Sequence, residues 1–303
     1  MGEQVYRLTL PPEAKGERLD VFLASQLSMT RSRLQRLIKQ EFVHVEGQPV
    51  RSAHRLNGGE TVTIRVPPPA PLIAQPEDIP LKIIYEDEHL IVVDKPRGMV
   101  VHPAAGHHSG TLVNALLAHC DLKGINDRLR PGIVHRLDKD TTGILVVAKD
   151  ERTHLALAQQ IKDRTVQRSY LALVHGVPTP REGIITTRIG RHPIKRKRMA
   201  VLAEGGRIAI TRYRVDEVLQ ARYSLLTVWL ETGRTHQIRV HMEYIGHPVL
   251  GDPIYGRRGD KLPGQALHAA RLGFTHPATG QYMEFASDPP ADFQALLASL
   301  RVK

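Results

Sequence analysis

Two strongly apolar segments flank a short polar turn near the middle of the chain. The segments are Gly132–Val134 and Gly143–Ala148, and the turn between them carries an arginine, Arg136, and a carboxylate, Asp138. Strands this hydrophobic normally lie buried on both faces of a sheet. A polar turn between buried strands is therefore fixed by a rigid scaffold, and catalytic groups favour such positions. The pattern predicts a buried sheet with a functional loop at the ends of its strands.

The same residues also allow a simpler interpretation. An Arg-x-Asp pair in a turn is most often a surface ion pair, worth at most about 1 kcal/mol. Taken alone, Asp138 would be structural rather than catalytic. The catalytic interpretation depends on the agreement of several separate segments elsewhere in the chain.

The charge of the chain favours a polyanionic partner. Its 42 lysines and arginines exceed its 31 aspartates and glutamates, which gives a net charge of +11. Such an excess attracts nucleic acids through long-range fields and counterion release. A membrane surface would instead favour a basic amphipathic helix with aromatic anchors, and aromatic residues make up only 5% of this chain. We therefore expect a nucleic acid, and no membrane, among the partners.

The cysteine content and the first residues indicate a reducing compartment. Cys120 is the single cysteine, so no internal disulfide can form. The segment Met1–Arg7 has no apolar core of the kind that directs secretion. No apolar run approaches the roughly 18 residues that span a bilayer. We expect a cytoplasmic protein in which Cys120 is a small buried hydrophobe.

A proline-rich stretch divides the 303 residues unequally. Four of the five residues 67–71 are prolines, and two more prolines follow by residue 80. Such a segment favours extended polyproline geometry and acts as a semi-rigid spacer. We therefore expect a small domain at residues 1–66, a linker at 67–79 and a large domain at 80–303.

Helices and short strands are both expected in the small domain. Apolar residues at helical spacing predict helices over 17–27 and 31–40. Ser28 or Thr30 is placed to cap the second helix. Alternating patterns predict strands, separated by glycine-containing turns, over 42–45 and 61–66.

The second predicted helix is basic on its outer surface, where it carries Arg31, Arg33, Arg36 and Lys39. Spacing alone would make these residues a solvated helix face. The segments Arg-Leu-Asp-Val-Phe-Leu at 18–23 and Asn-Gly-Gly-Glu-x-Val at 57–62, however, resemble the RNA-binding domain first seen in protein four of the small ribosomal subunit. This resemblance implies a small α/β RNA-binding domain whose four basic side chains contact RNA.

Mixed helix and strand patterns run through the large domain. It opens with two strands around an acidic turn over 83–94, and a helix follows over 110–119 with Thr111 placed to cap it. Later strand patterns lie at 169–174, 184–189, 207–215 and 223–231, and helical patterns recur at 154–163, 236–245 and 291–300. Largely antiparallel strands with helices packed against them make an α+β domain.

Several segments, in order along the large domain, resemble the RluA/RluD family of RNA pseudouridine synthases. They are Lys-Pro-x-Gly-x-x-Val-His-Pro at 95–103, His-Arg-Leu-Asp at 135–138, Arg-Ser-Tyr at 168–170, Gly-Arg-Thr-His-Gln-Ile-Arg at 233–239, Gly-His-Pro-Val-Leu-Gly-Asp-Pro at 246–253 and Gln-Ala-Leu-His-Ala at 265–269. The resemblance extends from about Ile84 to the C-terminus. It implies an α+β catalytic domain, with a mixed and mainly antiparallel sheet, that isomerises uridine in RNA.

The resemblance implies catalytic roles for three residues. Asp138 corresponds to the essential aspartate, Tyr170 to the tyrosine that stacks on the target base, and Arg239 to the arginine that pairs with the aspartate. Arg239 can hold Asp138 bidentately and keep it ionised. Arg136 is long and planar enough to fill the place of a flipped base or to hold phosphates.

Structural alternatives stay open for these residues. Arg136 can be a partner of Asp138 or Asp140, Tyr170 a core residue and Arg239 a phosphate contact. Three mechanisms also stay open, because Asp138 can attack the sugar, attack the pyrimidine ring or remove a sugar proton.

The densest basic run of the chain lies at 191–198. Its cations suit a loop that grips phosphates without reading bases, and they are Arg191, Lys195, Arg196, Lys197 and Arg198. The 16 histidines show no metal-ligand spacing, and no glycine-rich phosphate loop is present. We therefore expect no metal and no cofactor, since uridine and pseudouridine are isomers.

The sequence therefore predicts a monomeric pseudouridine synthase that acts on RNA with base flipping. The RluD-like branch of the family implies large-subunit ribosomal RNA, or a ribosomal precursor particle, as substrate, and transfer RNA is the alternative. A non-catalytic RNA-binding assembly factor is a second alternative, against which the presence of Asp138, Tyr170 and Arg239 argues. An RNA hydrolase is a third, and it would cleave its substrate.

Overall fold

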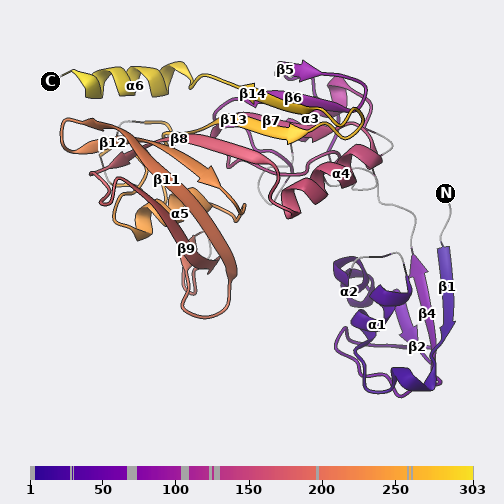
Figure 1. The fold of residues 1–303 in the computed structure, drawn as a ribbon. Coiled ribbons are helices and arrows are strands. Elements are labelled where there is room, and N and C mark those ends of the chain that lie inside the picture. The colour runs from indigo at the N-terminus through magenta and orange to yellow at the C-terminus, as the bar shows by residue number, and fades with distance from the viewer. Residues whose placement is uncertain are drawn as a thin grey trace. The chain divides into compact units, whose positions relative to one another are not determined.

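The structure, a computed structural model, describes residues 4–27, 29, 31–66, 74–103, 109–122, 125, 130–195, 198–257, 259–260 and 262–302, without the side chains of residues 32 and 33. The chain divides into two compact units, Met1–Pro71 and Leu72–Lys303. Figure 1 shows the helices and strands of both units.

The first unit is a small four-stranded sheet with two helices packed on it. The strand order is β1-β4-β2-β3, and all pairs are antiparallel. The strands are β1 (Gln4–Thr9), β2 (Val43–Val45), β3 (Gln48–Pro49) and β4 (Thr61–Val66), and the helices are α1 (Leu19–Gln26), α2 (Arg31–Lys39) and the 3₁₀ turn η1 (Pro12–Ala14). Leu23 of α1, Leu34 of α2 and Ile64 of β4 share one buried apolar core.

Both helices and two strands of this unit lie within two residues of the predicted bounds. The edge strand β1 was not predicted, because its side chains stay largely solvent-accessible and give little apolar pattern. Ser28 and Thr30, the predicted caps of α2, lie outside the described residues.

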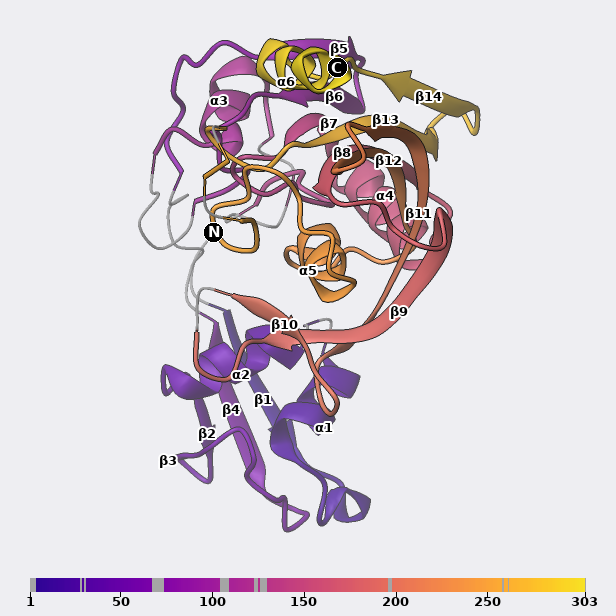
Figure 2. The same cartoon turned by 90° about the vertical axis from the view of Figure 1, so that its left-hand side faces the viewer.

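The second unit is built on one mixed sheet of ten strands in the order β10-β9-β11-β12-β8-β13-β7-β6-β5, with β14 paired to β13. All pairs are antiparallel except β13 with β7. The strands are β5 (Lys82–Glu86), β6 (Leu90–Lys95), β7 (Thr142–Ala148), β8 (Gln167–His175), β9 (Glu182–Arg191), β10 (Met199–Val201), β11 (Arg207–Leu219), β12 (Tyr223–Leu230), β13 (Leu267–Thr275) and β14 (Tyr282–Ala286). In Figure 2 the strands from β8 to β9 curve around the helix α5. The predicted α+β class is confirmed.

Four helices complete the second unit. They are α3 (Leu112–His119), α4 (Glu151–Lys162), α5 (Gln237–Tyr244) and α6 (Ala291–Arg301). Thr111 caps α3 as predicted, in a reciprocal capping box with Asn114. The helix α4 begins three residues before its predicted start because Asp150 caps it by accepting a hydrogen bond from the Thr153 N–H (2.8 Å).

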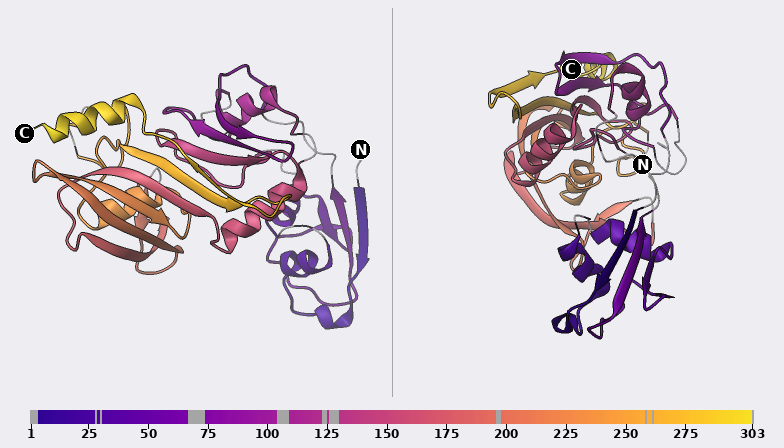
Figure 3. Two further views of the ribbon diagram at one scale, coloured as in Figure 1. Left: turned by 45° about the horizontal axis from the view of Figure 1, so that its top comes forward. Right: turned by 90° about the vertical axis from the view of Figure 1, so that its right-hand side faces the viewer.

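The strand β7 is buried on both faces, as its hydrophobic run predicted. Leu145 and Val147 pack in the core that includes α3 and α6, while Ile144 and Val146 pack with Leu157 of α4. Figure 3 (left) shows α3 and α4 on opposite sides of this part of the sheet.

The second predicted strand, Gly132–Val134, is not a strand. Ile133 forms a single isolated bridge with Val147, and Gly132 has a φ of +73°. A Cβ at Gly132 would come within 2.1 Å of the Ala148 carbonyl oxygen, so the chain turns here where only glycine fits. The apolar residues are therefore buried in a turn rather than in a ladder.

The central strand β13 fixes the spacing between β7, which follows the Asp138 turn, and β8, which carries Tyr170. Ala269 pairs with Gly143 of β7 on one side and with Tyr170 of β8 on the other. Gly143 has a φ of +108°, and a Cβ there would come within 2.3 Å of the Ala269 carbonyl oxygen. The missing side chain lets β7 approach β13 closely, directly after the turn that holds Asp138.

Residues 74–79 make contacts within the second unit, although the sequence assigned them to the linker. Ala74 is buried in its core, and Ile79 packs against it. The Asn114 side chain donates to the Gln75 carbonyl (2.7 Å). Among the described residues, none of the helices combines the length and the apolar character needed to cross a lipid bilayer.

Candidate active site

Asp138 lies in a tight turn that leads directly into β7. The Thr141 N–H donates to the Asp138 carbonyl (3.1 Å), which closes the turn. Leu137 is buried in the core beneath it, whereas Arg136 is exposed. The Asp138 side chain is 16% exposed, so the carboxylate sits at the boundary between core and solvent. The core side chain and the turn together fix its direction.

Arg239 joins Asp138 to a second carboxylate, Asp252. Its Nη1 donates to Asp138 Oδ2 (2.9 Å), and its Nε and Nη2 donate to the two oxygens of Asp252 (2.6 and 2.8 Å). The bidentate contact is therefore with Asp252, and Asp138 receives one hydrogen bond rather than the two we expected. Asp138 Oδ1 accepts no hydrogen bond from any residue that the structure describes.

Asp252 holds the Arg239 guanidinium in a fixed orientation. Its side chain is fully buried, and its Oδ1 also accepts from the N–H groups of Ile254 (2.9 Å) and Tyr255 (3.0 Å). Burial alone raises the pKa of Asp252, but Arg239 and these two N–H groups outweigh burial and hold the pKa below its usual range. The same two carboxylates raise the pKa of Arg239 against the opposing effect of its burial.

Tyr170 lies on β8 beside this charged group. It is 6% exposed, and burial raises the pKa of its hydroxyl. Arg168 opposes this rise and Asp138 adds to it, so the hydroxyl lies within reach of both charges. Tyr170, Asp138 and Arg239 line one small pocket together with Leu230. The structure thus brings the three predicted catalytic residues together.

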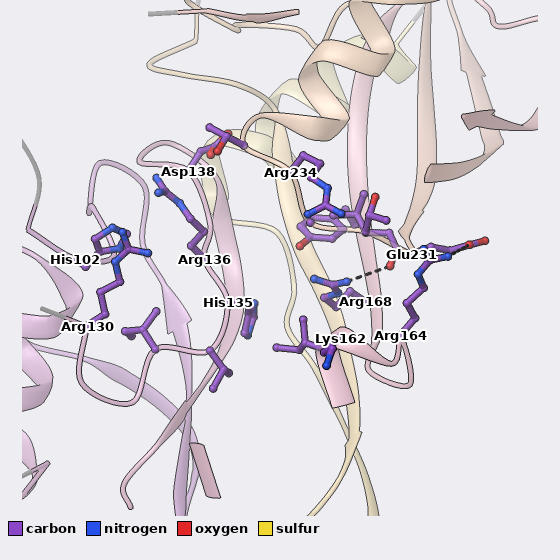
Figure 4. A pocket seen from close by; sticks show the side chains of 18 residues that line it. His102, Arg130, His135, Arg136, Asp138, Lys162, Arg164, Arg168, Glu231 and Arg234 are labelled. Atoms are coloured by element: carbon purple, nitrogen blue, oxygen red, sulfur yellow. Dashed lines mark hydrogen bonds and ion pairs between the residues drawn. The ribbon is translucent and has the colours of Figure 1, made fainter. Parts of the chain in front are cut away.

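A larger cavity of about 440 Å³ opens beside Tyr170 and Asp138. Six cationic residues line it, and two carboxylates, Asp138 and Glu231, accompany them. Figure 4 shows Arg136 and Asp138 on one side, with Arg234 and Arg168 on the other. The six cations are Arg130, Arg136, Lys162, Arg164, Arg168 and Arg234. A cavity of this size and charge suits a nucleotide with its neighbouring phosphates.

Lys95 fastens the Asp138 turn to the preceding loop. It is 1% exposed, and its Nζ donates to the carbonyl oxygens of Pro96 (2.9 Å), Met99 (2.9 Å) and Lys139 (3.0 Å). Burial lowers its pKa to about 7, while the charges of Asp138 and Asp140 oppose the shift. The three acceptors match the three donors of an ammonium group. The Lys-Pro segment therefore holds the Asp138 turn in place through the buried Lys95.

Arg136 forms no ion pair or hydrogen bond with a described residue, and it lines the cavity as an exposed side chain. The structural alternative for Arg136, a bond to Asp138 or Asp140, is therefore absent from the described part of the chain.

The predicted basic run lies between β9 and β10. Arg191 and Lys195 are exposed, and Arg196 and Lys197 lie outside the described residues. Arg198 instead forms an ion pair with Glu243, and its guanidinium lies 4.8 Å from the centre of the Tyr255 ring. The Arg239 guanidinium lies 5.1 Å from the centre of the same ring. Tyr255 is therefore shared by the last residue of the basic run and by the partner of Asp138.

The basic helix α2 of the first unit presents Arg36 and Lys39 as exposed side chains, and the side chain of Arg33 lies outside the described residues. Arg31 is engaged by the fully buried Asp20 (2.9 Å). Burial raises the pKa of Asp20, but hydrogen bonds from Arg18, Gln35 and Arg31 outweigh it and hold the pKa below its usual range. Arg31 therefore also has a structural task.

Sequence reasoning assigned no role to Asp252, Arg168 or Arg234. Asp252 precedes a proline in a segment that we used only for the resemblance, and nothing in its spacing pointed to Arg239. Arg168 could have been found, because it lies two residues before Tyr170 and strand residues at that spacing share a face. Within the described residues, no group of histidine, cysteine and acidic side chains is arranged to hold a metal ion.

The fold agrees with comparisons to known proteins. Residues 89–244 match the family model of RNA pseudouridylate synthases, and residues 17–62 match that of the S4 domain. The chain is 48% identical to an uncharacterized RNA pseudouridine synthase, YlyB, of Bacillus subtilis, over 97% of each chain. It is 46% identical to the ribosomal large subunit pseudouridine synthase D of Zymomonas mobilis, over 98% of each. The solved structure of human RNA pseudouridylate synthase domain containing 1 matches with a TM-score of 0.57 and 26% identity, covering 75% of this chain and 97% of that one.

These similarities place the protein among the RNA-modifying isomerases. The chain belongs to the RNA pseudouridylate synthase family, and it carries an S4 domain in its first unit. It is an enzyme that converts uridine to pseudouridine in RNA.

Proposed function

We propose that Asp138 is the group that reacts with the target nucleotide, and that Arg239 positions it. The observation that carries this proposal is that the two carboxylates in the cavity differ in how completely they are paired with cations and hydrogen-bond donors. Glu231 is engaged by Arg164 and Arg212, whereas Asp138 has one oxygen held by Arg239 and the other without a described hydrogen-bond donor. A fixed but incompletely bonded carboxylate beside a buried tyrosine is suited to act as nucleophile or base.

The cavity gives each neighbouring side chain a task in this proposal. The target uridine leaves the RNA stack to enter the cavity, since no side chain can reach it inside a helix. Tyr170 and Leu230 offer flat and apolar surfaces for the base. Arg136 fills the vacated stack, and the exposed Arg130 and Arg164 contact phosphates.

The reaction then proceeds in three stages. The bond between C1′ and N1 breaks, the uracil turns within the cavity, and C5 bonds to C1′ while N1 takes a proton in place of the one that C5 loses. Asp138 starts the first stage by attacking the sugar, attacking C6 of the ring or removing a sugar proton.

We further propose large-subunit ribosomal RNA as the substrate. Support comes from relatives named ribosomal large subunit pseudouridine synthase D, which are 45–48% identical over at least 98% of this chain. The S4 domain in the first unit supports additional contacts to the same RNA. In this proposal the enzyme works as a monomer in the cytoplasm and takes part in ribosome biogenesis, with Arg36 and Lys39 of α2 and the 191–198 run contributing to RNA affinity.

One experiment tests both parts. Pseudouridines are mapped across total RNA from cells that carry the wild-type gene, no gene, or the gene for Asp138→Asn. We expect a site in large-subunit ribosomal RNA to lose its modification in the last two strains. Purified Asp138→Asn should lose turnover by more than the roughly 10²–10⁴-fold typical of a proton-transfer group, with RNA affinity little changed. Loss of a transfer-RNA site instead would refute the ribosomal assignment, and an active variant would refute the role of Asp138.

A further inference from the structure

Arg168 is a buried cation for which the described part of the chain provides no carboxylate. It is 7% exposed, its Nε lacks a hydrogen-bond partner, and its Nη2 reaches the Leu230 carbonyl only at 3.5 Å. Nearby His135 is uncharged, because burial and Arg168 lower the pKa of its imidazole to about 3. Burying an unpaired guanidinium is costly, so its presence in a cavity indicates that a ligand completes it.

Arg168 borders the place where the base must lie. It precedes Tyr170 by two residues on β8, and both buried side chains line the cavity with Asp138. Its Nη1 lies against Gly233, where a Cβ would come within 3.2 Å. Figure 4 shows Arg168 near Arg234, across the cavity from Arg136 and Asp138. A base stacked on Tyr170 would therefore have Arg168 beside it.

The cations of the cavity differ in solvent exposure, and this difference indicates two kinds of ligand contact. Arg130, Arg136, Lys162 and Arg164 are exposed and suit phosphates, which stay partly hydrated when bound. Arg168 is buried and lies close enough to Tyr170 to affect the pKa of its hydroxyl, so it is placed to meet a polar edge of a pyrimidine. Electrostatic interactions are strongest where water is excluded.

We propose that Arg168 stabilises the negative charge that develops on the uracil ring during the reaction. This inference rests on the proposed role of Asp138 and adds a second group to the chemistry. When Asp138 attacks the sugar or removes a sugar proton, the electron pair of the C1′–N1 bond passes to N1 and spreads over O2 and O4. When Asp138 attacks C6, the ring electrons move to C5 and O4.

The proposal therefore holds for each of the three mechanisms. In all of them the uracil carries a negative charge that is absent from the bound uridine. The charge disappears when C5 uses an electron pair of the ring to bond to C1′. C5 then loses its proton and N1 gains one, which leaves the ring neutral. A group that binds this charged ring, and not neutral uridine, accelerates the chemical step without tightening substrate binding.

The test compares Arg168→Met and Arg168→Lys with Lys162→Met as a matched control. Lys162 is an exposed cation of the same cavity, which we expect to contact phosphate. Each variant is assayed for single-turnover rate at saturating enzyme, RNA affinity, and the dependence of affinity on salt. The RNA is a transcript that the wild-type enzyme converts. Thermal unfolding shows whether each variant is folded, and removing an unpaired buried cation should not lower its midpoint.

We expect Arg168→Met to lower the single-turnover rate about 10²–10³-fold, as the loss of an anion-stabilising donor does. RNA affinity should stay within about twofold of the wild-type value. The salt slope of binding should stay within about 0.2 of the wild-type slope. Arg168→Lys should recover part of the rate. Lys162→Met should show the reverse pattern: its salt slope falls by about 0.7–0.9, and its single-turnover rate at saturating enzyme falls much less than that of Arg168→Met.

A second substrate checks the charge directly. 5-Fluorouracil is a more acidic leaving group than uracil, so it needs less stabilisation of its anion. The rate defect of Arg168→Met should therefore be smaller when 5-fluorouridine replaces the target uridine and its consumption is followed. An equal defect with both substrates, or a normal rate with weakened binding and a reduced salt slope, would overturn the proposal and leave Arg168 as a structural or phosphate-binding residue.

The same experiment separates this inference from the proposed function. If wild type is active, Asp138→Asn is inactive and Arg168→Met matches wild type, only the role of Arg168 fails. If Asp138→Asn stays active, the proposed role of Asp138 fails first.

Discussion

Replacing Arg239 with methionine should expose how much of the site is held by one buried cation. Asp252 is fully buried, and Arg239 is 4% exposed between it and Asp138. In Arg239→Met, Asp252 keeps two backbone hydrogen bonds but loses its counter-charge. Removing one partner of a buried ion pair costs about 3–5 kcal/mol. We expect a loss of this size in the free energy of unfolding at pH 7.

The loss should depend on pH with a defined sign. In wild type the pKa of Asp252 lies below its usual value, so its contribution to stability is present above that value and is lost as the pH falls through the folded-state pKa. In Arg239→Met, burial without a cation raises the pKa, and the protein is destabilised wherever the unfolded carboxyl is ionised. The difference between wild type and variant should therefore be largest at pH 7. It should narrow by up to about 1.4 kcal/mol per pH unit toward pH 5.

Asp252→Asn in the Arg239→Met background separates stability from chemistry. The amide removes the buried charge, so the double variant should recover most of the stability but none of the turnover, since Asp138 still lacks its partner. The single tryptophan, Trp229, lies on β12, so urea unfolding followed by its fluorescence reports on the second unit alone. A pH-independent loss in Arg239→Met that Asp252→Asn does not relieve would refute this account.

Three further predictions concern the target base, the contact between β7 and β13, and the first unit. Tyr170→Phe should bind RNA nearly as wild type does, whereas Tyr170→Ala should weaken binding by about 1–3 kcal/mol, measured as an affinity change on the same RNA; equal affinities for both would argue against stacking. Gly143→Ala should lower the unfolding midpoint and the turnover together, because its Cβ would overlap the Ala269 backbone, and a fully active variant would contradict the close approach of β7 and β13. A chain that starts at Leu72 should fold and keep its chemistry but require more RNA to saturate. Arg36→Ala and Lys39→Ala in the full chain should each reduce the salt slope of RNA binding by about 0.7–0.9, with Lys15→Ala as the unchanged control; an unchanged slope in both would refute a role of α2 in RNA binding.

The sequence determined the elements whose pattern is local. The apolar run of β7 forces a buried strand, and the helical spacing of α2 and α6 needs no distant partner to be recognised. The Thr111 cap was also readable, because capping depends on residues three positions apart. The turn around Asp138 could be predicted as a site because buried apolar segments on both sides hold a polar turn in a fixed position. The resemblance then assigned Asp138, Tyr170 and Arg239 to one reaction.

The tertiary structure decided the contacts that join distant segments. Asp252 lies 114 residues after Asp138, and only the packing of α5 brings Arg239 between them. The strand β13 escaped prediction because its buried positions do not alternate, and its pairing with β7 and β8 sets the distance from Asp138 to Tyr170. Likewise, the spacing to Tyr170 places Arg168 on the same face of β8, but it does not show which side chains surround the guanidinium. No described carboxylate pairs with Arg168, and this depends on which side chains the fold places around it. Desolvation and charge balance depend on all the neighbours in space, and only two of those neighbours are adjacent in sequence.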